Sequence, residues 1–378
     1  MATIGIDCRM YSSRFTGIGR YVYELTSNLF KIDDQNHYVL FFNDPEYSEF
    51  TPPNERVTKV RANARHYSFS EQIKLLFLLR KHKLDLMHFT HFNAPILFKH
   101  PSVVTIHDLT LSFYPGKKMT SGLFRHAYKK TISSAVKNAK KVIAVSKNTK
   151  KDIQEILHTN PSKIEVIYEG VNTNFRPIED ETYQLKLKEK HGIKGSFLLY
   201  TGVWRSHKNL QNLIRAFSIL KKEYGYDGHL VITGKHDPTY AKDIFRLTSE
   251  LALTQDIIFT GMVEELELIA LYSAAQVYVF PSLYEGFGLP PLEAMQCGTP
   301  VAASNRSCMP EICGEDNALF FNPESPQNMA ETIFRLTSEP TLRQKLIQNG
   351  FARVKDFSWE TMAKETLALY ESALQPTP

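Results

Sequence analysis

The chain has 378 residues, of which 43% are hydrophobic and 22% charged, so it has the composition of a globular protein and the length of two domains. Its four cysteines form no CxxC pair and have no histidines at zinc-finger spacing, which argues against a disulfide framework and a structural zinc site. The first residues, MATIGID, are typical of a β-strand and not of a signal peptide, and the longest apolar runs are too short to cross a bilayer. We therefore expect a cytoplasmic protein, either soluble or peripheral on the inner face of the cell membrane.

The net charge of +5 is divided unevenly along the chain. Residues 1–175 contain 25 lysines and arginines against 15 acidic residues, a net charge of +10, whereas the remainder carries −5. A basic half is typical of a domain that meets a polyanion or an anionic membrane, although a solvated surface of mixed charge explains it equally well. No basic motif with interleaved aromatic residues is present, so we expect no nucleic-acid partner.

Short apolar runs alternate with longer amphipathic stretches in the first half of the chain. We expect strands at 3–7, 38–42, 84–89, 102–108, 141–146 and 164–170. We expect helices at 17–31, 70–83, 118–139 and 147–157. Strands that alternate with helices in this way predict βαβ units and a parallel sheet.

The second half repeats this pattern. We expect strands at 197–202, 229–234, 257–261, 277–282, 300–304 and 318–322. We expect helices at 209–223, 238–252, 264–274, 290–297, 326–337 and 340–353. The sequence thus predicts an α/β protein with Rossmann-like domains at 1–176 and 196–355, a polar linker at 177–195, and a terminal segment, 356–378, that contains an amphipathic helix.

The stretch YEGFGLPPLEAM (284–295) follows a predicted strand and places Glu285 and Glu293 on either side of a Gly-x-Gly turn and two prolines. Ligands of open α/β sheets bind at the carboxyl ends of the strands. We expect Glu293 in the first turn of the next helix, where it could accept hydrogen bonds from ribose hydroxyls, and Glu285 at the far end of the same ligand. Taken singly, Glu293 is better explained as an acid at a helix N-terminus and Glu285 as a solvated loop residue. Together with the turn, they favour a nucleotide-sugar.

The turn itself suits a phosphate. Its glycines let the backbone approach a ligand closely, and Pro290 or Pro291 fits the first position of the following helix. The free N–H groups near Gly288 and Leu289 would then point out of the helix end, where an anion is stabilised.

The motifs in their order resemble the retaining, glycogen-synthase-like glycosyltransferases of family four, which have the GT-B fold. The residues that carry the resemblance are EGFGLPPLEAM followed by CGTPVAAS, and FTGIGRYVYEL, HFTHFNAP, VTIHDL, TGVWRSHKNL, FTGMV, LYSAA and FSWE. They extend over nearly the whole chain. The resemblance implies two Rossmann-like domains that face each other across a cleft, and a C-terminal helix that crosses back to the first domain. The most similar members transfer mannose or related sugars in bacterial polysaccharide and glycolipid assembly.

The resemblance implies that the loop TGVWRSHKNL binds the donor phosphates. Lys208 matches the family, and Arg205 is a substitute, because Val203 stands where many members have arginine and His207 stands where others have the arginine of an Arg-Lys pair. Two cations there could neutralise a diphosphate leaving group. The alternative is a pair of solvated surface cations.

The N-terminal half contributes two further matches. Gly17 and Gly19 match the family's glycine loop, which contacts the donor phosphate; a dinucleotide fingerprint is discounted because Val22 replaces its third glycine. The resemblance places His107 beside the donor sugar, to bond its hydroxyls or to stabilise the transition state, whereas the residues alone favour a core histidine bonded to a carbonyl. The candidate catalytic residues are His107 and Glu285. The candidate donor-binding residues are Gly17, Gly19, Arg205, Lys208, Phe287, Gly288, Leu289 and Glu293.

We expect no metal and no cofactor. His88 and His91 have H-x-x-H spacing without a third ligand, so we expect them to shape the acceptor cleft, and the chain contains no Asp-x-Asp motif. Retention by double displacement would need a carboxylate nucleophile at the anomeric carbon. In the family the equivalent of Glu285 is not well placed for this, and a front-face process is favoured, in which the leaving phosphate helps to deprotonate the acceptor.

The sequence therefore predicts a retaining, metal-independent hexosyltransferase that moves mannose from GDP-mannose to a glycan or a lipid-linked acceptor in bacterial polysaccharide or glycolipid synthesis. The alternatives are a nucleotide-sugar epimerase of the same architecture and a non-catalytic, membrane-associated binding protein. Residues 70–83 and 117–141 combine apolar faces with basic clusters that could lie on an anionic membrane. The alternative for both is packing on the sheet with solvated lysines.

Overall fold

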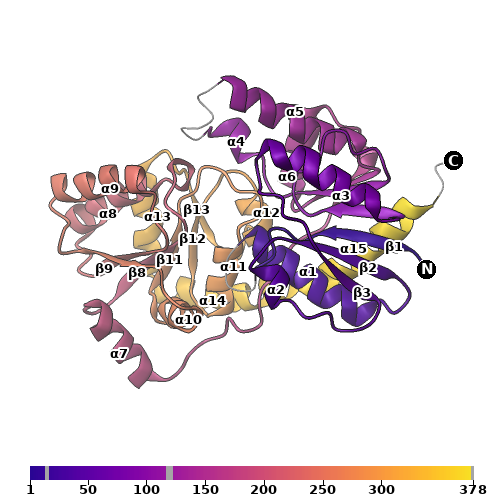
Figure 1. Cartoon of the computed structure of the whole chain (residues 1–378). Helices are drawn as coiled ribbons and strands as arrows, with labels where there is room; N and C mark the ends of the chain where they lie inside the picture. The colour runs from indigo at the N-terminus through magenta and orange to yellow at the C-terminus, as the bar shows by residue number, and fades with distance from the viewer. Residues whose placement is uncertain (13–16, 116–121, 376–378) are drawn as a thin grey trace. The chain divides into compact units, whose positions relative to one another are not determined.

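The computed structural model describes residues 1–12, 17–115 and 122–375 (Figure 1). The chain divides into two compact units. The first unit comprises Met1–Gly170 and Ser358–Pro378, and the second comprises Val171–Phe357. Each unit is an α/β domain built on its own parallel sheet, as the alternating pattern predicts.

The sheet of the first unit has seven parallel strands in the order β3-β2-β1-β4-β5-β6-β7. The strands are β1 (Thr3–Asp7), β2 (His37–Phe42), β3 (Val57–Arg61), β4 (Leu86–Phe89), β5 (Ser102–Ile106), β6 (Lys141–Ala144) and β7 (Ile164–Val166). The helical segments are α1 (Ile18–Ile32), α2 (Glu46–Glu49), the π-helix η1 (Glu71–Leu75), α3 (Leu76–Lys81), α4 (Thr110–Phe113), α5 (Gly122–Asn138), α6 (Lys147–Leu157) and the 3-10 turn η3 (Pro161–Lys163).

The sheet of the second unit has six parallel strands in the order β10-β9-β8-β11-β12-β13. The strands are β8 (Phe197–Thr201), β9 (His229–Thr233), β10 (Ile257–Gly261), β11 (Val277–Phe280), β12 (Val301–Ser304) and β13 (Leu319–Phe321). The helical segments are α7 (Glu181–His191), η4 (Ser206–Lys208), α8 (Leu210–Tyr224), α9 (Pro238–Glu250), α10 (Glu265–Ala274), α11 (Leu289–Gln296), α12 (Met309–Cys313), α13 (Pro326–Ser338), α14 (Pro340–Arg353) and η5 (Val354–Asp356).

Central strands of both sheets are buried along their whole length. Every residue of β5, β8 and β11 is buried, as expected for parallel strands covered by helices on both faces. Apolar positions of α8 and α13 pack against each other and against the second sheet to form its core. All twelve predicted strands are present, with ends that shift by a few residues.

The last helix belongs to the first unit, which confirms the expected crossover. α15 (Trp359–Leu374) packs on α1, β4 and β5, and Ser358 accepts the cap hydrogen bond from the Thr361 N–H at 3.4 Å. The Tyr370 hydroxyl lies 2.6 Å from His88 Nδ1, on β4. The helix therefore completes the core of the domain in which the chain begins.

The predicted linker is wrong. Residues 177–195 belong to the second unit, whose boundary is at Val171, and most of them form α7, which packs on α10. Asp180 caps the helix by accepting from the Tyr183 N–H at 3.0 Å, and Lys190 pairs with Glu267 on α10. The helix has no apolar stripe because Leu187 is its one buried residue, so its sequence has the composition of a solvated segment.

Candidate functional site

The order of the second sheet reverses between β8 and β11, and the predicted ligand-binding loops follow these two strands. β8 continues to β9 on one side, whereas β11 continues to β12 on the other. Such a switch point leaves a crevice at the carboxyl ends of the strands, where ligands of open α/β sheets bind. Both predicted loops therefore lie at the switch point between β8 and β11, where open α/β sheets bind their ligands.

The loop after β8 is tied to the loop after β11 by three contacts. The Leu283 N–H donates to the His207 carbonyl at 2.8 Å, and Asn209 Nδ2 donates to the Pro281 carbonyl at 3.0 Å. The third contact is an ion pair: Lys208 Nζ lies 2.6 Å from Glu285 Oε1. The structure therefore brings two of the predicted residues together.

The Lys208–Glu285 pair lies at the edge of the solvent. The side chains are 19% and 14% exposed, and the ammonium also lies over the Phe280 ring, 5.7 Å from its centroid. A cation and a carboxylate in contact neutralise each other. A ligand that carries both phosphate and hydroxyl groups could bind Lys208 through its phosphate and Glu285 through its hydroxyls, in place of the ion pair. Arg205, in the same loop, is exposed.

The backbone that carries Glu285 is held by the start of α12. Ser307 Oγ accepts from the Glu285 N–H at 3.2 Å and donates to the Glu285 carbonyl at 2.5 Å. The Cys308 thiol donates to the Phe287 carbonyl at 3.0 Å. Burial raises the pKa of this thiol well above its ordinary value, so it keeps its proton and remains a donor. These hydrogen bonds fix the conformation of the loop that carries Glu285.

Gly288 begins α11 with a backbone that only glycine adopts readily. Its φ is +100°, and a Cβ atom there would overlap the Met309 side chain. The helix starts at Leu289, so Pro290 occupies the second position and not the first. Because Pro290 and Pro291 have no N–H, the unbonded donors of this helix end are concentrated at its first residues. No side chain caps this end, which leaves it open to an anion.

Glu293 lies in the second turn of α11, so its predicted place in the first turn is wrong, and so is its role as an N-terminal acid. Glu293 Oε2 instead accepts a hydrogen bond from the Tyr272 hydroxyl at 3.2 Å. That hydroxyl lies 2.9 Å from Thr201 Oγ1, at the end of β8, which lies 3.0 Å from the Tyr278 hydroxyl. Burial raises the pKa of Tyr272, so the phenol keeps its proton and orients the carboxylate.

Phe287, the remaining candidate in this loop, is 5% exposed and packs edge-on against Phe357 at 5.6 Å between ring centroids. Its side chain therefore serves the core of the second unit. A contact between this residue and a ligand would come from its backbone.

His107, Gly17 and Gly19 lie in the first unit. Gly17 precedes α1 with a φ of +72°, and a Cβ atom on Gly19 would come within 3.0 Å of the Met10 carbonyl. His107 follows β5, and the Tyr21 ring of α1 meets it edge-on at 4.7 Å between centroids. Residues 15 and 16 of the glycine loop lie outside the described residues.

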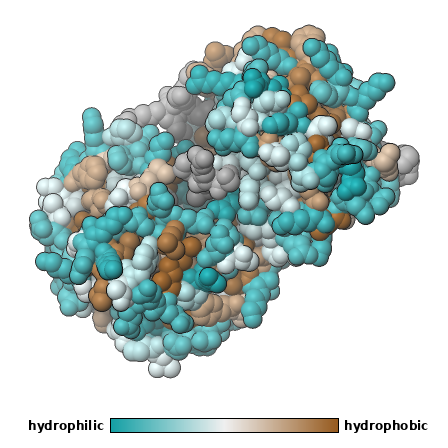
Figure 2. Space-filling model, turned by 60° about the horizontal axis from the view of Figure 1, so that its bottom comes forward, coloured by the Kyte–Doolittle hydropathy of each residue, from teal (hydrophilic) through white to brown (hydrophobic). Residues whose placement is uncertain are grey.

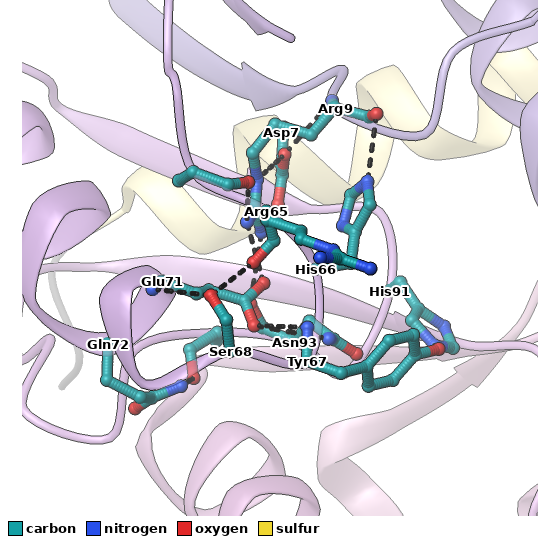
Figure 3. A network of polar contacts seen from close by, with 12 residues as sticks. Asp7, Arg9, Arg65, His66, Tyr67, Ser68, Glu71, Gln72, His91 and Asn93 are labelled. Carbon is teal, nitrogen blue, oxygen red and sulfur yellow. Dashed lines mark hydrogen bonds and ion pairs between the residues drawn. The ribbon is translucent and has the colours of Figure 1, made fainter.

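A buried charged network occupies the carboxyl end of β1 in the first unit (Figure 3). Arg9 is bonded to Asp7 at 2.7 Å and to Glu71 at 2.6 Å, and both of its ion pairs are almost fully buried. Glu71 Oε2 also accepts from the Tyr67 N–H at 3.0 Å, and the Tyr67 hydroxyl lies 3.1 Å from His91 Nε2. β1 and β4 flank the point where the order of the first sheet reverses, so this network fixes the loops at the second switch point of the molecule.

Two family models match this chain in succession. The model of Glycosyltransferase Family 4 matches residues 15–175, and the model of glycosyl transferases group 1 matches residues 184–353. The matched segments correspond closely to the two structural units. The chain belongs to glycosyltransferase family 4.

Several relatives of this family 4 glycosyltransferase are mannosyltransferases by name. It is 29% identical to the serotype-specific mannosyltransferase WbdA of Escherichia coli over 72% of this chain, but it spans only 34% of that protein. It is 25% identical to the O-antigen chain mannosyltransferase B of Escherichia coli, over 94% of this chain and 96% of the relative. An uncharacterized glycosyltransferase of Methanocaldococcus jannaschii is 31% identical over 81% of this chain and 80% of its own.

Solved structures show the fold of this family 4 glycosyltransferase. Sucrose-phosphate synthase from Thermosynechococcus elongatus superposes with a TM-score of 0.80, at 22% identity, over 98% of this chain and 99% of that one. Anabaena HepE in complex with UDP and glucose superposes with a TM-score of 0.77, at 17% identity, over 98% and 100% of the chains. Together with the two parallel sheets, these likenesses confirm the GT-B fold.

Some residues that build the site of this family 4 glycosyltransferase were not predicted. Asn209, Ser307 and Cys308 hold the two loops, and Glu169 lies beside His107. Only Asn209 carried a signal, because asparagine tolerates a left-handed backbone and this residue stands at the start of the helix predicted at 209–223. Its φ is +60°, and α8 begins after it. The other three are distant in sequence from the residues that they contact.

Among residues 1–12, 17–115 and 122–375, no three His, Cys, Asp or Glu side chains are gathered as a metal ion would require. A surface cavity of about 580 Å³ lies on the second unit between α8 and the start of α13. Arg215, Lys222 and Gln327 are among the residues that line it, and it includes none of the predicted site residues.

Proposed function

We propose that this family 4 glycosyltransferase transfers a hexose, with retention and without a metal, from a nucleotide-diphospho-sugar to a glycan or lipid-linked acceptor. The observation that carries the proposal is the Lys208–Glu285 pair, 2.6 Å apart, beside the uncapped N-terminus of α11. A cation and free N–H groups suit the diphosphate, and a carboxylate suits hydroxyl groups. Both stand at the switch point of the second sheet.

Each partner has a part in the proposed reaction. When the bond between the anomeric carbon and the phosphate breaks, negative charge develops on the leaving diphosphate. Lys208, Arg205 and the Gly288–Leu289 backbone would stabilise that charge. Glu285 would position the hexose, and Glu293, oriented by Tyr272, would accept hydrogen bonds from the ribose.

Mannose is the proposed hexose and GDP-mannose the proposed donor. The names of the relatives support mannose, and the O-antigen mannosyltransferase supports a role in bacterial polysaccharide synthesis. The proposed acceptor site is in the first unit, where the buried Asp7–Arg9–Glu71 network fixes the loops around Tyr67 and His91. His107 is the proposed catalytic residue of this unit, and the Gly17–Gly19 loop would meet the donor phosphate.

We further propose that the first unit rests on an anionic membrane. Hydrophobic side chains form brown patches on the otherwise hydrophilic surface (Figure 2). Phe69, Ile73 and Phe77, which are four residues apart along η1 and α3, are 81%, 43% and 59% exposed. Basic side chains follow in the last turn of α3. Leu123 and Phe124 are 77% and 57% exposed at the start of α5. Residues 116–121, within the second predicted segment, lie outside the described residues, and no helix in the described part of the chain is long and apolar enough to cross a bilayer.

The experiment that tests the transferase is a donor panel. Purified protein is mixed with UDP-, GDP- and ADP-sugars in EDTA, with and without acceptor glycans, and both the released nucleoside diphosphate and the sugar product are identified. We expect release with GDP-mannose that increases with acceptor, and an α-linked product. Conversion of the donor to an epimer without acceptor would instead establish the epimerase, and binding without turnover would establish the silent binding protein.

Vesicle sedimentation tests the membrane proposal. We expect the protein to sediment with vesicles that contain anionic phospholipid and to remain in solution with purely zwitterionic ones. Replacing Phe69 and Phe77 with serine should reduce binding, whereas the same change at Phe245, an exposed residue of α9 in the second unit, should not. Equal binding to both kinds of vesicle, or none, would contradict the proposal.

A further inference from the structure

Tyr67 combines an exposed ring with a strained backbone in the loop after β3. It is 63% exposed, and its φ is +57°, a conformation that a bulky residue rarely adopts. Such strain persists only where the surrounding structure holds the residue in place. Two hydrogen bonds do so here, because the Tyr67 N–H donates to Glu71 Oε2 at 3.0 Å and the hydroxyl lies 3.1 Å from His91 Nε2. The ring is therefore fixed although it faces solvent.

The two residues that hold Tyr67 are themselves buried. Glu71 is 2% exposed and lies 2.6 Å from Arg9 in the charged network (Figure 3). Buried charges keep closely defined partners, because water cannot solvate them. His91 is 7% exposed, and its ring packs on the Phe92 ring at 4.2 Å between centroids. The buried network thus positions a side chain that lies on the surface.

Phe69, two residues further along, is exposed in a different way. It is 81% exposed, and no other ring in the described part of the chain contacts its ring. The Tyr67 ring, in contrast, meets His91 edge-on at 6.3 Å and Phe92 at 6.0 Å between centroids. A ring that is held through its hydroxyl and its edge, and is still 63% exposed, offers a face to a ligand.

A hexose matches the surface around this ring. One face of a pyranose carries C–H groups, which the negative face of an aromatic ring attracts, and the rim of the pyranose carries hydroxyl groups. Beside Tyr67, His91 Nδ1 and Asn93 Oδ1 are buried without a hydrogen-bond partner among the described residues. Buried polar atoms are normally paired, so these two mark a remaining capacity for a polar ligand. An acyl chain could cover the ring but could not bond to these atoms.

We infer that Tyr67 is a stacking platform for a hexose ring of the acceptor glycan, held in position by Glu71 and His91. That the bound sugar is the acceptor rests on the proposed function, whereas sugar binding at Tyr67 does not. The face of the Tyr67 ring contacts the C–H groups of the sugar. The hydroxyl of Tyr67 stays bonded to His91 and sets the orientation of the ring.

NMR of the full chain with ring-labelled tyrosine tests sugar binding directly. The Tyr67 signals are identified by their loss in Tyr67→Phe, and methyl α-mannoside, methyl α-glucoside and an α-linked mannobiose are added at millimolar concentrations. We expect at least one of these sugars to shift the Tyr67 signals saturably, and the ring current of Tyr67 to shift the C–H protons of the bound sugar. No effect of any of them on the Tyr67 signals would overturn the inference. A shift with anionic vesicles and with none of the sugars would also overturn it and assign Tyr67 to the membrane surface.

Two variants separate the ring of Tyr67 from its hydroxyl. Tyr67→Ala removes the stacking surface, so the affinity for the sugar should fall roughly 10-fold. Tyr67→Phe keeps the ring and loses the bond to His91, so its loss should be smaller. Phe245→Ala, which removes an exposed ring of the second unit, should bind the sugar as the wild type does. Equal affinity in a folded Tyr67→Ala would contradict the assignment.

Turnover distinguishes this inference from the proposed function. With the donor and acceptor that the panel identifies, Tyr67→Ala should raise KM for the acceptor roughly 10-fold, with little change in kcat or in KM for the donor. An unchanged KM for the acceptor would show that the sugar bound at Tyr67 is not the acceptor and would overturn the inference. Absence of transfer with every donor would overturn the proposed function and leave the sugar-binding result valid.

Discussion

Lys208 and Glu285 are 77 positions apart in the chain, and they form the contact on which the proposed donor site depends. Glu285 was predicted to reach one end of a nucleotide-sugar and Lys208 to neutralise its diphosphate, but their contact with each other was not predicted. A partly exposed ion pair stabilises a protein little, because solvent screens it. The pair therefore adds little to folding, and its position at the switch point is consistent with the proposed donor site.

Lys208→Met should impair turnover far more than it impairs stability. Without the ammonium, the charge that develops on the leaving diphosphate loses a preorganised partner, and kcat/KM should fall by roughly 100- to 1000-fold. Release of the nucleoside diphosphate measures this effect. Lys345→Met, on the exposed surface of α14, is the matched control and should behave as the wild type. Wild-type turnover in Lys208→Met would remove this residue from the site.

His88 should make the free energy of unfolding depend on pH in the acid range. Burial, followed by repulsion from His107, lowers the pKa of His88 to about 3, whereas in the unfolded chain the ring titrates at about 6.5. Between these values the unfolded chain binds a proton that the folded chain does not. The free energy of unfolding should therefore be insensitive to His88 above about pH 6.5 and should fall as the pH is lowered toward 3.

Urea denaturation at a series of pH values tests the contribution of His88. His88→Gln should be less stable at neutral pH, because the hydrogen bonds to Tyr370 and Thr105 change. Its stability should fall less steeply than that of the wild type as the pH is lowered. The same slope in both proteins would show that His88 titrates alike in the folded and unfolded chains.

At the scale of elements, the periodicity of apolar residues predicted most helices and strands. It failed for elements that bury few of their side chains. β3 was missed because it is an edge strand with lysine and arginine at exposed or half-buried positions. α7 was missed because its one buried residue leaves no stripe. Residues 70–83 were predicted as one helix, but they contain the π-helix η1, whose first residue, Glu71, is bonded to Arg9. Arg9 and Glu71 are 62 positions apart in the chain, so no local pattern of residues could predict their ion pair.

Gly288→Ala tests whether the start of α11 needs its backbone conformation. The added methyl group would be strained at a φ of +100° and would overlap Met309, so we expect a loss of about 1–3 kcal/mol in the free energy of unfolding, and weaker nucleotide binding. Gly225→Ala, at the end of α8, is the control, because its φ of +66° is also positive but nothing lies within 4 Å. It should cost less stability and leave binding unchanged. Equal effects of the two changes on binding would contradict the role of this turn.

At the scale of the whole molecule, the alternation of strands and helices was sufficient to predict two parallel α/β domains. It could not place the boundary between them, because the first unit ends at Gly170 and resumes at Ser358, which are far apart in the sequence. These two positions meet only in the fold, where a Cβ atom on Gly170 would overlap the backbone of Ser358 and Trp359. The two prolines of α11 and the cations of the loop after β8 are local features that follow strand ends, so the sequence could indicate the candidate donor site there. The contacts of Glu169, Ser307 and Cys308 join segments that are distant in the sequence, so no local feature could predict them.

A chain that ends at Phe357 should lose the order of its first unit and keep that of its second. Removing residues 358–378 exposes the faces of α1, β4 and β5 that α15 covers. Hydrogen exchange should accelerate in β4 and β5 and remain slow in β8 and β9. Uniform acceleration in both sheets would show that the units do not fold independently.

The most direct test of the donor site is hydrogen exchange of the full chain with and without GDP-mannose and UDP-glucose. The account predicts that at least one of these donors slows exchange in peptides that cover 202–209 and 284–293, the loops joined by the Lys208–Glu285 pair. Lys208→Met should weaken this protection. Protection confined to the cavity between α8 and α13, or no protection by either donor, would contradict it.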